Sequence, residues 1–155
     1  MSHISRWAAA ALLATTSFAW ADIPNPLRIA TEGAYPPFNS VDANGQLVGF
    51  DVDIAKALCA EMKANCEIVA QDWDGIIPAL VANKYDAIIA SMSITDERKQ
   101  SIDFTNKYYS NYLAVIAPSG GVTGPSDLNR KTVGAQRSTL ASQWAEDQLM
   151  GRASI

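Results

Sequence analysis

The chain has 155 residues, with 12 lysines and arginines against 16 aspartates and glutamates, and a formal net charge of −4. This acidic balance argues against a nucleic-acid partner, which requires a basic face. The single histidine is His3, within a segment that we expect to be removed. The remaining chain then has no histidine for acid–base or metal chemistry, which excludes most hydrolase mechanisms.

Residues 1–21 have the pattern of a secretory signal peptide. Arg6 provides a basic start, residues 7–20 form an apolar run, and Ala19-Trp20-Ala21 supplies a cleavage site. A membrane anchor is the alternative, but this run is shorter than the ~20 residues that span a bilayer. No later segment resembles a transmembrane helix, so we expect a periplasmic protein without a membrane span in its mature chain.

Strand and helix patterns alternate from Leu27 onward. Strands are predicted over 27–31, 67–70 and 87–90, and helices begin at Asp51 and at Asp72 or Asp74. This alternation indicates an α/β domain with a largely parallel sheet. Ligands bind beyond the carboxyl ends of such strands. The loops that follow these ends hold Glu32, Trp73 and Ser91, so we expect them to converge.

The first of these helices carries its apolar side chains on one face and ends near a pair of cysteines. The face consists of Ile54, Ala55, Leu58 and Met62. The two cysteines of the chain, Cys59 and Cys66, would lie ~10 Å apart in a continuous helix, and a disulfide requires Cα atoms within ~7 Å. Pairing therefore requires the helix to stop between them, with Asn65 as its C-terminal cap. An oxidising compartment favours the disulfide, and two reduced buried thiols are the alternative.

The run A-I-I-A-S-M-S-I-T-D-E-R, residues 87–98, combines a buried strand with a helix start. Ser91 and Ser93 follow the strand, and Thr95 opens a helix that places Arg98 in its first turn. Hydroxyls, free backbone N–H groups and a planar guanidinium at one point suit a carboxylate. A simple strand-to-helix turn with a capping Thr95 and a solvated Arg98 is the alternative.

A second unit follows a segment rich in glycine and proline at 118–125. Strands are predicted before it, over 102–105 and 112–117. After it we expect a helical turn near Asp127, a strand over 132–135, and a helix from Ser138 to about Met150. One strand and one helix cannot close a core, so this second domain is expected to be incomplete.

Six motifs follow one another along the chain: L-R-I-A-T-E-G-A-Y-P-P-F (27–38), G-F-D-V-D-I-A (49–55), the two cysteines, W-D-G-I-I-P-A-L (73–80), D-A-I-I-A-S-M-S-I-T-D-E-R (86–98) and D-F-T-N-K-Y-Y (103–109). With them the chain resembles the periplasmic solute-binding proteins of polar amino-acid ABC transporters. It is most similar to the branch that binds lysine, arginine, ornithine or histidine.

The resemblance implies a two-lobed α/β fold, the type II periplasmic binding protein fold. Lobe 1 would span 22–112, a hinge or crossing strand 113–117, and the start of an incomplete lobe 2 118–155. It also implies a monomer that captures a cationic amino acid and delivers it to an ABC permease. No cofactor, metal or catalytic residue is expected.

The resemblance also assigns roles to eight side chains. Arg98 would pair with the ligand α-carboxylate, with help from Ser91 and Ser93. Tyr35 and Trp73 would sandwich the aliphatic stem, and Glu32 would meet the distal cation. At a helix start, Ser138 and Thr139 would hold the carboxylate. The structural alternatives are a surface Arg98 or Glu32, core packing of the aromatic rings, and capping by Ser138 alone.

Three positions depart from the family pattern, and two other functions compete. Glu32 stands where several relatives carry aspartate, Ala90 where some carry a hydroxyl, and Arg137 where many carry glycine. The runner-up function is a periplasmic enzyme on the same fold, similar to a cyclohexadienyl or arogenate dehydratase, with Glu32 as general acid. The sensor domain of a receptor is the third.

Overall fold

The computed structural model describes residues 23–155, so the predicted signal peptide lies outside the described residues. The first part of this chain is built on a parallel sheet of order β5-β1-β6. Its strands are β1 (Leu27–Thr31), β5 (Cys66–Ala70) and β6 (Ala87–Ile88). The predicted parallel sheet is therefore confirmed, with β6 shorter than the predicted 87–90.

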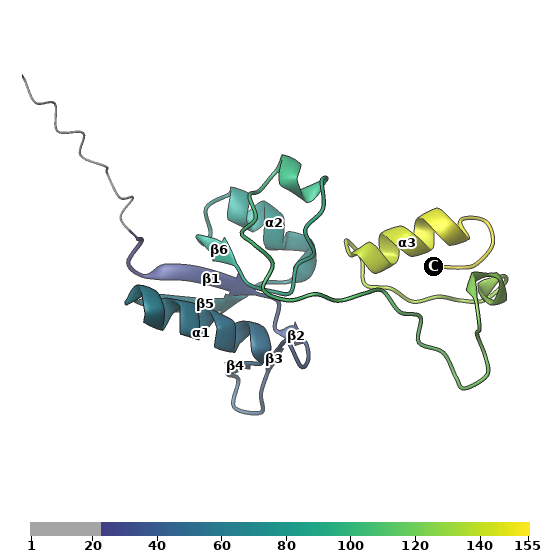
Figure 1. Cartoon of the computed structure of the whole chain (residues 1–155), viewed down its shortest axis with the longest axis horizontal. Helices are drawn as coiled ribbons and strands as arrows, with labels where there is room; N and C mark the ends of the chain where they lie inside the picture. The colour runs from purple at the N-terminus through teal and green to yellow at the C-terminus, as the bar shows by residue number, and fades with distance from the viewer. Residues whose placement is uncertain (1–22) are drawn as a thin grey trace, which may run out of the picture.

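Two helices cover opposite faces of this sheet, α1 (Phe50–Met62) and α2 (Trp73–Val81) (Figure 1). Successive residues of a strand point to opposite faces, and β1 follows this rule. Ile29 packs with Ala55 of α1, whereas Ala30 packs with Ile76 of α2. We call this part, residues 23–100, the N-terminal body.

A small antiparallel sheet leads into α1. It consists of β2 (Ala34–Tyr35), β3 (Asn39–Val41) and β4 (Leu47–Val48). The chain turns into the helix at Gly49, where φ is 119° and a Cβ atom would lie 2.5 Å from the Phe38 carbonyl oxygen. Only glycine fits there. The prediction that Asp51 caps α1 is wrong, because Gly49 holds the N-cap and Asp51 lies in the first turn with a fully buried side chain.

The helix α1 ends between the cysteines, and they form a disulfide, as predicted. Their Cα atoms lie 6.2 Å apart. The residue that ends the helix is Lys63, in the left-handed conformation with φ 53°, and the prediction of Asn65 is wrong. The buried stripe is Val52, Ala55 and Cys59. The buried face of α1 is therefore rotated relative to the predicted one: Cys59 of the disulfide is buried, and Leu58 and Met62 are exposed.

The last part of the chain contains η2 (Pro125–Leu128) and α3 (Leu140–Leu149). The helical turn near Asp127 is thereby confirmed. Leu128 packs with Ala145 and Leu149 in a separate small core. In Figure 1 this C-terminal body, residues 122–155, stands apart from the sheet and is connected to it by a long extended run.

The three strands predicted at 102–105, 112–117 and 132–135 are not strands in the structure. Tyr112 and Ile116 are 89% and 96% exposed. Apolar residues favour an extended chain, but a strand also needs a partner to accept its ladder hydrogen bonds. No other segment of residues 23–155 pairs with 112–117, and Thr132 makes only a single bridge to Ser154. Of the helices within 23–155, none is both long and apolar enough to cross a membrane.

Candidate binding site

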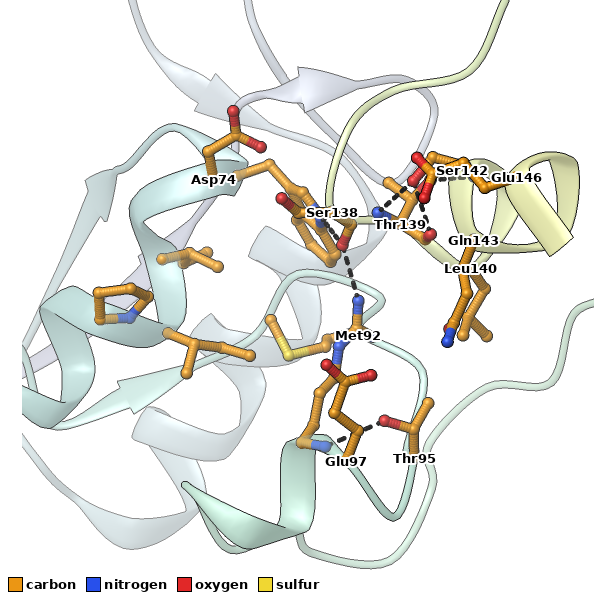
Figure 2. A pocket seen from close by; sticks show the side chains of 15 residues that line it. Asp74, Met92, Thr95, Glu97, Ser138, Thr139, Leu140, Ser142, Gln143 and Glu146 are labelled. Atoms are coloured by element: carbon orange, nitrogen blue, oxygen red, sulfur yellow. Dashed lines mark hydrogen bonds between the residues drawn. The ribbon is translucent and has the colours of Figure 1, made fainter. Parts of the chain in front are cut away.

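A cavity of about 440 Å³ lies between the two bodies. The N-terminal body contributes α2 and the loop after β6, and the C-terminal body contributes the start of α3. In Figure 2, Ser138 and Thr139 face Met92, Thr95 and Glu97 across this space. The cavity thus lies beyond the carboxyl end of β6, where a parallel sheet is expected to bind its ligand.

Arg98 is the cationic side chain of this cavity. It begins a single 3₁₀ turn, η1 (Arg98–Gln100), in place of the longer helix that the sequence suggests. The Thr95 hydroxyl accepts the Arg98 backbone N–H at 3.1 Å, whereas Glu97 holds the N-cap of this turn. Burial lowers the pKa of the Arg98 guanidinium, and neighbouring Glu97 opposes this shift. The guanidinium nevertheless stays charged, because arginine is protonated throughout the physiological pH range.

The guanidinium of Arg98 is held in place by two backbone carbonyls. Nη1 donates to the Ser93 carbonyl at 2.9 Å and Nη2 to the Ser138 carbonyl at 3.1 Å. Its central carbon lies 5.4 Å from the centre of the Trp73 ring, within range of a cation–π contact. Trp73 also donates its indole N–H to Ser138, at 2.9 Å. The Ser138 carbonyl oxygen therefore accepts hydrogen bonds from both the Trp73 indole and the Arg98 guanidinium.

Three consecutive residues, 136–138, make every hydrogen bond and ion pair found between the two bodies within residues 23–155. We call them the bridging segment. The Gln136 amide donates to the Glu32 carboxylate, Arg137 pairs with Asp74 at 3.2 Å, and Ser138 accepts from Trp73 and Arg98. The bridging segment thus places an N–H donor at Glu32 and a carbonyl acceptor at Arg98.

The start of α3 differs from the prediction in its capping residue. Ser138 has a φ of 60°, and Thr139 is the N-cap, with its hydroxyl accepting the Ser142 N–H at 3.2 Å. The Thr139 hydroxyl also donates to the Gln136 carbonyl at 2.7 Å. The prediction of Ser138 as the cap is wrong, because a residue in the left-handed conformation precedes the cap.

The remaining predicted residues do not line this cavity, and Ser91 and Ser93 line a neighbouring one of about 520 Å³. Ser91 donates its hydroxyl to Asp51 at 2.9 Å, and Ser93 contributes its carbonyl to Arg98. Tyr35 stacks on Phe38 with ring centres 5.1 Å apart and is not part of the cavity lining. The structure therefore brings Trp73, Arg98, Ser138 and Thr139 into one lining and joins Glu32 to it through Gln136. Their ligand roles stay predictions.

The charge of the lining favours a cationic molecule. Asp74, Glu97 and Glu146 contribute carboxylates, against the one guanidinium of Arg98. Within residues 23–155, no three or more histidine, cysteine or acidic side chains gather closely enough to hold a metal ion. The arrangement can therefore hold a small molecule by charge and by aromatic contact.

Sequence reasoning missed four residues that shape this region: Asp51, Tyr108, Gln136 and Glu146. The place of Asp51 at a helix start predicts a cap and does not reveal that its side chain is buried. Tyr108 lies in a motif of the family resemblance, but its partners are 17 and 57 residues away. No local pattern could identify Gln136, whose partner Glu32 is 104 residues away.

The parallel sheet, the arginine–tryptophan pair beyond it and the second body across the cavity define an α/β protein of two lobes with a cavity between them. The family profile described as "Bacterial extracellular solute-binding proteins, family 3" matches residues 27–135. The chain belongs to this family, which confirms the resemblance and the fold class predicted from the sequence.

Three known proteins illustrate the similarity. An L-arginine-binding protein of Pseudomonas aeruginosa is 50% identical over 126 residues, which cover 80% of this chain and 49% of that protein. A Salmonella typhimurium periplasmic binding protein, described as having high arginine specificity, has a TM-score of 0.77 at 34% identity and is matched over 85% of this chain and 59% of its own.

The third is a point mutant of the arginine-bound form of domain 1 of TmArgBP, with a TM-score of 0.53 at 39% identity, matched over 64% of this chain and 72% of that one. The chain spans about half the length of the curated relatives it matches. This agrees with the prediction of an incomplete second lobe.

Proposed function

We propose that this protein binds a cationic amino acid, arginine foremost, in the periplasm and delivers it to an ABC permease. The observation that carries the proposal is the cavity lined by Arg98 and Trp73 among three carboxylates. Two arginine-binding relatives support the choice of ligand. We propose that the chain has no catalytic activity, since these relatives are named as binding proteins.

In the proposed complex, the ligand takes the contacts that the bridging segment now makes. The α-carboxylate accepts from the Arg98 guanidinium where the Ser138 carbonyl accepts now, with Ser91, Ser93 and Thr139 near it. The aliphatic stem lies along the rings of Trp73 and Tyr35. The distal cation donates to Glu32 in place of the Gln136 amide. A charged donor makes a stronger hydrogen bond to a carboxylate than a neutral amide does.

We propose that the N-terminal body supplies most of the binding contacts. Six of the eight predicted residues precede the extended run, and two of these six, Trp73 and Arg98, line the cavity. The arginine-bound form of domain 1 of TmArgBP supports this division of the contacts. The domain boundaries after residues 112 and 117 are part of the same proposal.

Calorimetric titration of the mature chain tests this function. We expect arginine, ornithine, lysine or histidine to bind, and arginine to bind about 10- to 100-fold more tightly than citrulline. Citrulline has nearly the same shape, but its urea group is neutral, and a charge-assisted hydrogen bond is worth ~1.5–3 kcal/mol, about twice a neutral one. Absence of binding to all four cationic amino acids would refute the proposal, and equal affinities for arginine and citrulline would refute the role of Glu32.

Replacing Gln136 with alanine is expected to tighten binding of arginine about three- to tenfold. The variant no longer has to break the bond to Glu32, which contributes ~1 kcal/mol as an exposed hydrogen bond to a charged group. Because this cost is common to all ligands, citrulline should gain the same factor. Gln148→Ala, on an exposed position of α3, is the matched control. Weaker binding by Gln136→Ala would mean that Gln136 contacts the ligand instead.

A further inference from the structure

We propose that Asp51 is a positioning residue of the ligand site, which fixes the two loops that carry Glu32, Tyr35, Ser91 and Ser93. This inference rests on the proposed function. Asp51 lies in the first turn of α1 and does not line the cavity. Its side chain is fully buried, and three donors from separate parts of the chain converge on its two oxygens.

The first loop is held through Asn39 of β3. The side-chain amide of Asn39 makes both bonds. Its nitrogen donates to one Asp51 oxygen at 2.8 Å, and its oxygen accepts the Gly33 N–H at 2.7 Å. Asn39 is fully buried as well. Gly33 lies between Glu32 and Ala34, with φ 81°, so this pair of bonds fixes the backbone of the loop that leads from Glu32 to Tyr35.

The second loop is held through Tyr108. The other Asp51 oxygen accepts the Ser91 hydroxyl at 2.9 Å and the Tyr108 hydroxyl at 2.8 Å, and the Tyr108 oxygen accepts the Ser91 N–H at 2.8 Å. Asp51, Ser91 and Tyr108 are therefore joined to one another by three hydrogen bonds. Its φ of 49° is unfavourable for a residue with a side chain, so the loop depends on these bonds to keep its course.

A carboxylate suits this position for electrostatic reasons. The start of α1 carries the positive end of the helix dipole, which favours a negative charge. Burial, together with the hydrogen bond to Asp51, raises the pKa of Tyr108 to about 12. The phenol is thus protonated at physiological pH and remains a donor to Asp51. Both oxygens of the Asp51 side chain are satisfied, and the bonds through Asn39, Ser91 and Tyr108 link this carboxylate to the two loops.

Tyr108→Phe is the sharpest test, with Tyr109→Phe as its matched control. The first variant removes the oxygen that bonds to Asp51 and Ser91 but keeps the ring, which packs beside Phe50. Tyr109 packs beside Phe38 and Phe50, and its hydroxyl makes no hydrogen bond within residues 23–155. We expect Tyr108→Phe to weaken arginine binding about tenfold at a temperature well below unfolding, and Tyr109→Phe to leave it within twofold.

Amide hydrogen exchange of the ligand-free protein separates this inference from the proposed function. We expect the Ser91 amide to be protected in the wild-type protein and in Tyr109→Phe, and to lose protection in Tyr108→Phe, while the Gly33 amide stays protected. In Asp51→Asn, one side-chain oxygen can still accept from Ser91 and Tyr108, so its affinity should fall between those of the wild-type protein and Asp51→Ala.

Two results would overturn the proposal. One is an unchanged arginine affinity in Tyr108→Phe, since a merely structural role lowers the melting temperature without changing the affinity of the folded protein. The other is retained protection of Ser91 in that variant. If the wild-type protein binds no cationic amino acid, the proposed function fails, and the exchange of Ser91 and Gly33 then decides on the positioning of the loops by itself.

Discussion

Replacing Arg98 with alanine is expected to weaken arginine binding by about 30-fold to several thousandfold, as measured by calorimetric titration. Arg98 is the only cationic side chain in the cavity lining of the described chain, and it is half-buried against Trp73. Loss of one partner from a desolvated charge pair costs ~2–5 kcal/mol, because the other charge remains unpaired. The ligand carboxylate would then lie beside Glu97 with nothing to balance it.

Two further variants define the Arg98 experiment. Arg98→Lys keeps the charge but loses the planar fork, so its affinity should lie between those of the wild-type protein and Arg98→Ala. Lys99→Ala is the control, since Lys99 is the neighbouring cation, is exposed, and pairs only with Asp96 at 3.2 Å. An Arg98→Ala protein with an affinity within threefold of the wild type would remove the central contact of the proposed site.

Replacing both Cys59 and Cys66 with alanine should lower the free energy of unfolding by about 2.5 kcal/mol, in the chain-entropy model for a loop this short. The disulfide joins α1 to β5 across a sequence separation of seven residues, and Cys59 is buried beside Ile29 and Ala55. The melting temperature, measured by circular dichroism, should fall by roughly 10 °C.

The disulfide variant should leave the site itself unchanged. Cys59 packs on the face of the sheet that α1 covers, whereas Trp73 packs on the opposite face with α2. Its arginine affinity at 15 °C should therefore stay within about twofold of the wild-type value, since distant sites act independently. Addition of a reducing agent should lower the melting temperature of the wild-type protein but not of the variant. Equal melting temperatures for both proteins would contradict the prediction.

The elements predicted correctly from sequence are those with a strong local pattern. The apolar run at 27–31 forms the central strand, and Asp72 precedes α2 as its N-cap. The two cysteines require a helix end between them, and the helix ends there. In each case the residues within one or two turns contain the whole signal, because dihedral preferences and local packing decide these features.

Two of the errors fall where distant partners decide the structure. The residues 112–117 have an apolar extended pattern, yet a strand exists only where another strand accepts its hydrogen bonds, and none within the described chain does so. Asp51 has the residue type and position of a helix cap, but Asn39, Ser91 and Tyr108 draw its side chain into the interior. A capping pattern does not reveal such competition, since the competing donors come from other segments.

The sequence by itself determined the family, the parallel α/β framework and the disulfide, and it predicts the side-chain chemistry of the site: a guanidinium, two aromatic rings and an acidic group. Only the tertiary structure decided how these groups are occupied. It joins Glu32 to Gln136 and Arg98 to the Ser138 carbonyl, and it ties two ligand loops to one buried carboxylate. The physical reason is that residue types and local periodicity are written along the chain, whereas a hydrogen bond between residues 40 or 104 positions apart depends on how the whole chain packs.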